Sequence, residues 1–315
     1  MSIPNAPKTK LRSSAIIGVV LCAISTMVPR IPQANASDTS TPTLANQPLS
    51  VYKARRQALL DRIRDGAIVL IGAREEDFGE VGRFRQKNDI MYLTGVETPA
   101  AAFMMAPAGL IPGRAAIETV FIPVRNRGRE QWTGFQVGPG AEGQAKFGVA
   151  EAAPSNELEP RLREMLNAPP FKVEGAAAKA KLYTIVPRGS TAAITREKLF
   201  IDFIRNLAPH VQIEDVSATI AGLRKVKSET EIDLLQKAID ITGEGHFEAA
   251  RSIKPGAFEY QVQGALEYAF TRNGAERAGF PSIVGSGIYS TILHYNESRK
   301  KIDAGDVIVV DIGAE

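Results

Sequence analysis

The chain has 315 residues, of which 38 are lysine or arginine and 35 are aspartate or glutamate. Four of the basic residues and none of the acidic ones lie in residues 1–36, so the remainder has a net charge near −1. This near-neutral remainder gives no support for a nucleic-acid or anionic-membrane partner. Cys22 is the only cysteine, which excludes an internal disulfide and a metal site made of thiolates.

Residues 1–36 are typical of a secretory signal peptide. A basic start precedes an apolar stretch from 15 to 28, and Ala34-Asn35-Ala36 matches the small-x-small cleavage pattern. A membrane anchor is the alternative, but the stretch is short for a bilayer-spanning helix and Pro29 follows it. We therefore expect cleavage after Ala36, no stable membrane anchor, and a secreted or periplasmic protein.

Two structured domains are predicted after this segment. Residues 37–48 are rich in small polar residues and proline and are predicted to be a flexible leader. Residues 49–215 alternate amphipathic helices with short apolar runs, which predicts an α/β domain. Its expected strands include residues 90–95. Residues 216–315 contain two helices followed by short strands, which predicts an α+β domain.

The first helix of the second domain has a clear start. Ser228 and Glu231 form the pattern of a capping box, in which each side chain reaches the other residue's backbone amide. An apolar stripe follows at helical spacing, formed by Ile232, Leu235, Ile239 and Ala250. His246 lies close to this stripe in the helical repeat and is predicted to be a packed histidine rather than a ligand.

Asp311 is the first candidate for chemistry. It ends the apolar run of residues 307–310, which is typical of a strand covered on both faces. Burial of a carboxylate there is costly unless the group is paired or bound to a cation. On the residues alone, an aspartate that accepts turn amides or pairs with lysine or arginine is the more frequent outcome.

His294 is the second candidate. Alternation along the expected strand 291–295 places it on the same face as Ile292. It can be a group that donates to substrate or carries a proton, or a hydrogen-bonded core histidine, and the residues alone leave both open. Just before it, Gly285-Ser286-Gly287 lacks the outer glycines of a nucleophile elbow and is predicted to permit close backbone approach.

Ordered segments over nearly all of residues 49–315 resemble the aminopeptidase P and prolidase branch of the pita-bread metallopeptidases. Several motifs in one register are more specific than any single one. The segments include Phe84-Arg85-Gln86, Tyr92-Leu93-Thr94-Gly95, Arg129-Glu130 with Trp132, Ile283-Val284-Gly285-Ser286-Gly287, Leu293-His294-Tyr295 and Val310-Asp311-Ile312-Gly313.

The resemblance implies a fold and an activity. The fold is an α/β N-terminal domain over 49–215, followed by the start of an α+β pita-bread catalytic domain over 216–315. The activity is release of the first residue from peptides with proline in the second position. It uses a hydroxide activated by two Mn²⁺ ions. Asp311 matches a metal-binding aspartate, and His294 matches the catalytic histidine that binds substrate. A homo-oligomer formed through the N-terminal domain is also implied.

The resemblance leaves alternatives. In the family pattern the second aspartate, a histidine and two glutamates of the metal site lie beyond Glu315, so the 315 residues alone are expected to be an inactive fragment. A prolidase, which cleaves Xaa-Pro dipeptides, shares the same motifs. A non-catalytic assembly or binding module of the family is the third possibility. A creatine-hydrolysing relative without metal is disfavoured by Asp311.

Overall fold

The computed structural model describes residues 43–75, 84–175, 178–188 and 195–315. The predicted signal peptide lies outside these residues, as do residues 37–42 of the expected leader. Residues 43–48 of that leader form a short antiparallel hairpin of β1 Thr43–Leu44 and β2 Gln47–Pro48. Among the described residues, no helix combines the length and the apolar character needed to cross a membrane.

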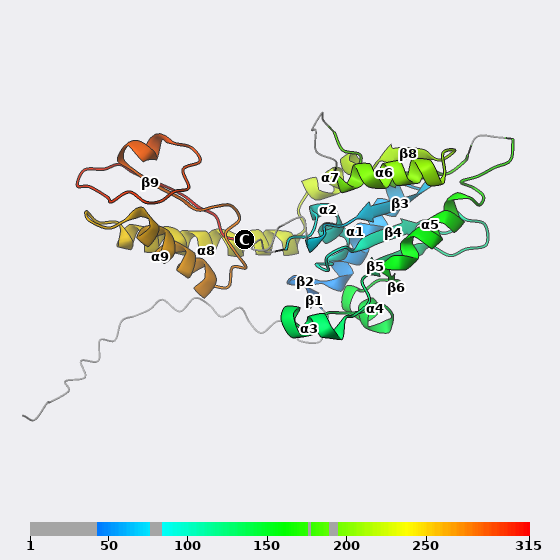
Figure 1. Cartoon of the computed structure of the whole chain (residues 1–315), viewed down its shortest axis with the longest axis horizontal. Helices are drawn as coiled ribbons and strands as arrows, with labels where there is room; N and C mark the ends of the chain where they lie inside the picture. Colours follow the sequence, from blue (N-terminus) through cyan, green and yellow to red (C-terminus); the bar gives the residue numbers. More distant parts are fainter. Residues whose placement is uncertain (1–42, 76–83, 176–177, 189–194) are drawn as a thin grey trace, which may run out of the picture. The chain divides into compact units, whose positions relative to one another are not determined.

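A six-stranded mixed sheet forms the centre of the N-terminal domain, which confirms the expected α/β class (Figure 1). The strand order is β6-β5-β4-β3-β7-β8, and the central β3 pairs antiparallel with β4 and parallel with β7. The strands are β3 Gly66–Ile71, β4 Ala102–Ala106, β5 Ile117–Ile122, β6 Glu151–Pro154, β7 Lys181–Thr184 and β8 Gln212–Asp215.

Helices cover both faces of this sheet. Alternate residues of β3 point to opposite sides: Ile68 and Leu70 enter one buried cluster, whereas Ala67 and Val69 enter the other. The first cluster includes residues of α1, α2, α4 and α7, and the second includes residues of α5 and α6. The helices are α1 Leu49–Arg62, α2 Asn88–Thr94, α3 Arg127–Thr133, α4 Ala141–Phe147, α5 Leu158–Leu166, α6 Arg196–Leu207 and α7 Ser217–Lys225.

Two expectations from the sequence need correction here. Residues 90–95 are not a strand, because α2 occupies them and ends at Gly95 in the left-handed conformation with φ of 64°. Helix α7, assigned above to the second domain, packs with Val216 and Ile220 in the core of the first. Because α7 is buried in the first domain, the boundary between the two hydrophobic cores lies after α7 rather than before it.

Arg56 of α1 is a buried cation that connects four parts of this domain. Its guanidinium donates to the carbonyl of Leu93 at 3.0 Å, to the Glu118 carboxylate at 3.0 Å and to the carbonyl of Gly148 at 2.6 Å. The carbonyl of Leu93 lies in the last turn of α2 and therefore has no amide partner within the helix. Arg55 donates to the neighbouring carbonyl of Tyr92 in the same way. Helix α1 therefore caps the end of α2 through two consecutive arginines.

Replacement of Arg56 by alanine should destabilise the protein by about 3–5 kcal/mol. The change removes the guanidinium donor from the buried carbonyl of Leu93, the partly buried carbonyl of Gly148 and the Glu118 carboxylate. Urea unfolding followed by circular dichroism measures the effect. The matched control is Arg64→Ala, because Arg64 is exposed and pairs with nearby Asp61. Its effect should stay within about 0.5 kcal/mol. Equal stability of the two variants would contradict this role of Arg56.

The second part of the chain contains two helices, a 3-10 turn and a two-stranded sheet. Helix α8 begins with the predicted capping box, which is present, with the Ser228 amide 2.9 Å from the Glu231 carboxylate. The elements are α8 Glu229–Ser252, α9 Glu259–Arg272, β9 Ile283–Ser286, η3 Gly287–Thr291 and β10 Ile308–Asp311.

The expected apolar stripe of α8 is not its packed face. Ile232, Leu235 and Ile239 are 54%, 51% and 62% exposed, whereas the buried residues are Ile241, Gly245 and Ala249. The reason is the close crossing of α9. A side-chain carbon at Gly245 would lie 2.4 Å from the ring of Phe270, so the crossing requires a residue without a side chain.

Candidate functional site

Asp311 is the last residue of β10, which pairs antiparallel with β9 so that Asp311 lies opposite Ile283. Ile308 and Val310 face the core of α8 and α9, whereas Val309 and Asp311 are exposed. The expectation of a strand covered on both faces is therefore wrong, because the two-stranded sheet packs through one face only. Within the described part of the chain, the Asp311 carboxylate makes no hydrogen bond or ion pair. It is free to bind a ligand on the open face.

His294 lies in a turn that follows η3, not in the expected strand over 291–295. Its imidazole is exposed and forms no hydrogen bond or ion pair with any described residue, and Leu293 beside it is 86% exposed. Tyr295 is instead the buried residue of this segment. The hydrogen-bonded core histidine considered above is thus not what the structure contains. His246 on α8 is also exposed, so its expected packing is wrong.

The two candidates come from neighbouring segments, the strand β10 and the loop after β9. The loop that carries His294 leaves β9 after Ser286, while Asp311 lies opposite Ile283, three residues earlier along that strand. Both side chains belong to the same small sheet and its connecting loop.

The residues that the structure describes do not make a metal centre by themselves. No three histidine, cysteine, aspartate or glutamate side chains in this part of the chain lie close enough together to hold an ion. Asp311 offers carboxylate oxygens, which suit a hard divalent ion, but one carboxylate is too few ligands for a two-ion site. The described donor set therefore does not fit the group that the resemblance implies.

The glycine-serine segment before the loop behaves as predicted. A side-chain carbon at Gly285 would lie 2.8 Å from the carbonyl oxygen of Tyr289, so the loop folds back directly onto the strand. Gly287 has φ of 58°, which starts the turn. Tyr289 then stacks on Tyr295 with ring centroids 4.9 Å apart. The close backbone approach predicted for Gly285-Ser286-Gly287 is confirmed.

A carboxylate that the sequence reasoning missed lies under this loop. Glu259, the first residue of α9, has no exposed surface and accepts four hydrogen bonds. The donors are the amide and hydroxyl of Ser286, the hydroxyl of Tyr295 and the amide of Lys300. Burial, together with the hydrogen bond to Glu259, raises the pKa of Tyr295 above its ordinary value. An acid in the first turn of a helix is common, so no local pattern indicates this role for Glu259.

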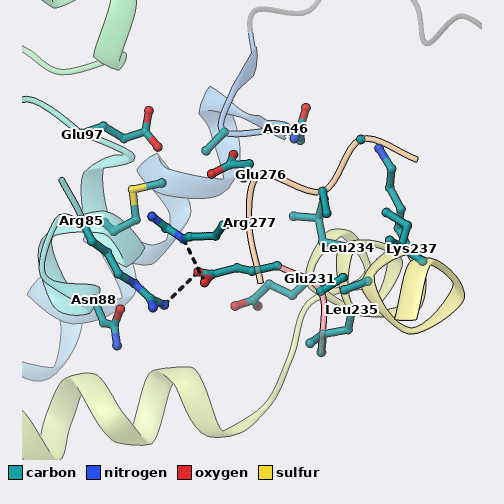
Figure 2. Close-up of a pocket in the computed structure, with 18 of the residues that line it drawn as sticks. Asn46, Arg85, Asn88, Glu97, Glu231, Leu234, Leu235, Lys237, Glu276 and Arg277 are labelled. Carbon is teal, nitrogen blue, oxygen red and sulfur yellow. Dashed lines mark hydrogen bonds and ion pairs between the residues drawn. The ribbon is translucent and has the colours of Figure 1, made fainter. Parts of the chain in front are cut away.

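A well-formed pocket lies elsewhere in the described part of the chain. It has a volume of about 900 Å³ and is lined by residues of α2 and α8 and by the segments 274–277 and 314–315. Arg85 and Arg277 donate to the Glu315 carboxylate at 2.8 and 3.2 Å. Figure 2 shows the two arginine side chains directed at one carboxylate. Neither Asp311 nor His294 lines this pocket. It is therefore separate from the candidate site.

Comparison with family models accounts for both parts of the chain. Residues 52–173 match the aminopeptidase P N-terminal domain, and residues 233–315 match metallopeptidase family M24. The chain joins an aminopeptidase P N-terminal domain to a family M24 metallopeptidase domain. A metallopeptidase family implies a divalent metal, although the identity of the ion does not follow from the match.

Individual relatives agree with this assignment. The Xaa-Pro aminopeptidase of Escherichia coli K12 is 30% identical over 267 residues, which are 84% of this chain and 58% of that protein. The Xaa-Pro dipeptidase of Pyrococcus horikoshii is 35% identical over 115 residues, which are 36% of this chain and 33% of that protein. The chain thus spans less than two thirds of the length of these relatives.

Solved structures confirm the fold class. A putative aminopeptidase P from Bacillus anthracis superposes with a TM-score of 0.75 at 23% identity, covering 84% of this chain and 61% of that one. The Pseudomonas aeruginosa aminopeptidase PepP gives a TM-score of 0.71 at 27% identity, covering 85% and 59%. Zinc-substituted E. coli aminopeptidase P, solved with product, gives 0.70 at 25% identity, covering 86% and 60%.

The 315-residue chain should bind Mn²⁺ only weakly, with a dissociation constant of roughly 1 mM or more, because Asp311 has no described neighbouring ligand. Isothermal titration of the purified chain with Mn²⁺ measures this. Asp311→Asn is the matched variant, since it preserves the shape of the side chain and removes its charge. Saturable binding of two ions at micromolar concentration, lost in Asp311→Asn, would contradict the expectation.

Proposed function

We propose that the chain is part of an Xaa-Pro aminopeptidase that releases the N-terminal residue from peptides with proline in the second position. The observation that carries the proposal is the joined pair of domains. The relative named Xaa-Pro aminopeptidase aligns over 84% of this chain and so includes both parts. The dipeptidase relative aligns over only 36%. This difference favours the aminopeptidase over a prolidase.

The site residues enter the proposal with distinct roles. Asp311 supplies a carboxylate to the divalent centre, and its exposed, unpaired position on the open face of β10 supports this role. His294 contacts the substrate, and its exposed position on the loop after η3 supports this. Manganese is the proposed ion, since hard oxygen ligands suit it.

Residues 1–315 by themselves are proposed to be inactive. The support is the donor set of the described residues, in which Asp311 has no second and third ligand near it. The proposed activity belongs to a protein that spans the full length of the relatives. A non-catalytic module remains the alternative, and a longer reading frame without further metal-binding acids would favour it.

A protein extended to the length of the E. coli relative should release the first residue from an Xaa-Pro-Yaa tripeptide when Mn²⁺ is present. The gene region beyond codon 315 supplies the sequence to express, and amino-acid analysis measures the product. Chelation should abolish release. Asp311→Asn should lower turnover by at least about 100-fold, because a missing ligand weakens the metal. Full turnover by Asp311→Asn would refute the assigned role.

A dipeptide substrate separates the two enzyme classes. The extended protein is expected to cleave an Xaa-Pro-Yaa tripeptide with a higher kcat/KM than the matching Xaa-Pro dipeptide. Preference for the dipeptide would establish the prolidase alternative. The 315-residue chain serves as the control in both assays and should release nothing above the uncatalysed background.

Export and assembly are further parts of the proposal. Cleavage after Ala36 places the protein outside the cytoplasm, and mass spectrometry of material made in an exporting host should find Ser37 at its N-terminus.

A homo-oligomer through the N-terminal domain is supported by Trp132 and Phe135, which are 88% and 69% exposed at and after α3. Light scattering on the same sample should give a multiple of the monomer mass, and an uncleaved monomer would contradict both parts.

A further inference from the structure

We propose that Glu259 is a positioning residue for His294, because it fixes the loop that presents this histidine. The inference rests on the proposed function for the role of His294 itself. It assigns to a buried carboxylate of α9 a task in the site that neither the sequence nor the family comparison indicated.

The hydrogen bonds to Glu259 come from three separate segments. One carboxylate oxygen, Oε1, accepts the amide and the hydroxyl of Ser286 in β9, both at 2.7 Å. The other, Oε2, accepts the hydroxyl of Tyr295 at 2.8 Å and the amide of Lys300 at 2.9 Å. Each oxygen therefore has two donors. An ionised carboxylate only accepts hydrogen bonds, so this arrangement suits it fully.

These three points are the two ends and the middle of one loop. The segment 287–300 starts beside Ser286, ends at Lys300, and is tied at Tyr295 between them. His294 directly precedes Tyr295 in the chain. Ile292 and Leu293, which precede the hydrogen-bonded Tyr295, are exposed and give the loop little apolar packing of its own. The position of the His294 backbone is therefore set by the Tyr295 contact with Glu259 together with the stacking of Tyr295 on Tyr289.

The start of α9 holds the same loop from the backbone side. The amide of Glu259 donates to the carbonyl of Lys300 at 3.0 Å, and the amide of Ile302 donates to the carbonyl of Ala257 at 2.8 Å. The segment that leads into β10, and hence to Asp311, starts from this point. The start of α9 thus holds, through the carboxylate and the backbone of Glu259, both the loop that carries His294 and the beginning of the segment that leads to Asp311.

A purely structural role would predict a different arrangement. Burial of a carboxylate costs several kcal/mol unless hydrogen bonds replace its lost hydration. An apolar residue would fill the same space under α9 without this cost. All four donors belong to the loop or to the two residues that bound it. A carboxylate at this position therefore orders the loop specifically, which an apolar residue would not do. A positioning role accounts for that choice.

The first test uses hydrogen–deuterium exchange on the 315-residue chain and needs no activity. Glu259→Gln keeps the size of the side chain but turns one acceptor into a donor that faces two donors. Amides of residues 286–300 should exchange about 10-fold faster or more, since charge-assisted hydrogen bonds are lost. Amides of the six-stranded sheet should be unchanged. Glu267→Gln on the same helix is the matched control, and its loop should exchange at the wild-type rate.

Tyr295→Phe covers the case in which Glu259→Gln does not fold. It removes one hydroxyl and keeps the ring stacked on Tyr289. Its loop amides should exchange several-fold faster while the circular dichroism spectrum stays that of the wild type. Unchanged loop exchange in a folded Glu259→Gln or Tyr295→Phe variant would overturn the proposal. Equal acceleration throughout α8, α9 and the loop would also overturn it, because that result indicates a general loss of stability.

The second test uses the extended, active protein and a double-mutant cycle. Glu259→Gln and His294→Ala should each lower kcat/KM, and the double variant should be no worse than His294→Ala alone, because the first acts through the second. Additive effects would overturn the positioning role. An extended protein without any peptidase activity would refute the proposed function instead, and the exchange experiment would still decide the role of Glu259 in ordering the loop.

Discussion

The arrangement of the M24 part depends on the Glu259 carboxylate, which has hydrogen-bond donors around it and no cation among the described residues. Lys300 gives Glu259 only its backbone amide, while its ammonium group pairs with Asp306 and Asp303. The negative charge is held by four oriented dipoles and by the start of α9, where the helix dipole favours an anion. Loop, strand and helix are consequently fixed relative to one another by a group that contributes no apolar packing.

The N-terminal domain uses the opposite charge in a comparable way. Arg56 is a buried cation whose partners are two carbonyls and one partly exposed carboxylate. Its neighbour Arg55 lies 4.2 Å from the ring centroid of Tyr92 and 3.3 Å from the Glu231 carboxylate at the start of α8. In both domains, a charged side chain at a helix connects segments far apart in the sequence, and apolar clusters surround the connection.

Much of the architecture could be predicted from local patterns. The capping box at Ser228 and the close approach at Gly285 each follow from one or two residues and their geometry. The errors arose where tertiary contacts decide the outcome. Residues 90–95 read as a strand because their apolar content is high, yet partners in α1 satisfy the last carbonyls of a helix there. The α8 stripe was assigned from spacing, but the small residue Gly245 determines the face that packs.

The site was less predictable than the fold. Asp311 and His294 were identified because the segments around them resemble family motifs. Their spacing and apolar neighbours alone do not distinguish them from structural residues. Glu259 gave no local signal, because its four donors are 27 to 41 residues away in the chain. Only the folded arrangement of β9, the loop and Lys300 around the start of α9 reveals what this carboxylate does.

The contact between Gly245 and Phe270 has an evolutionary consequence. A methyl group at position 245 cannot coexist with an aromatic ring at position 270 unless the two helices separate, and their separation would also shift β9 on the core. Homologues that keep this helix crossing are therefore expected to vary the two positions together, with a larger residue at one accompanied by a smaller residue at the other.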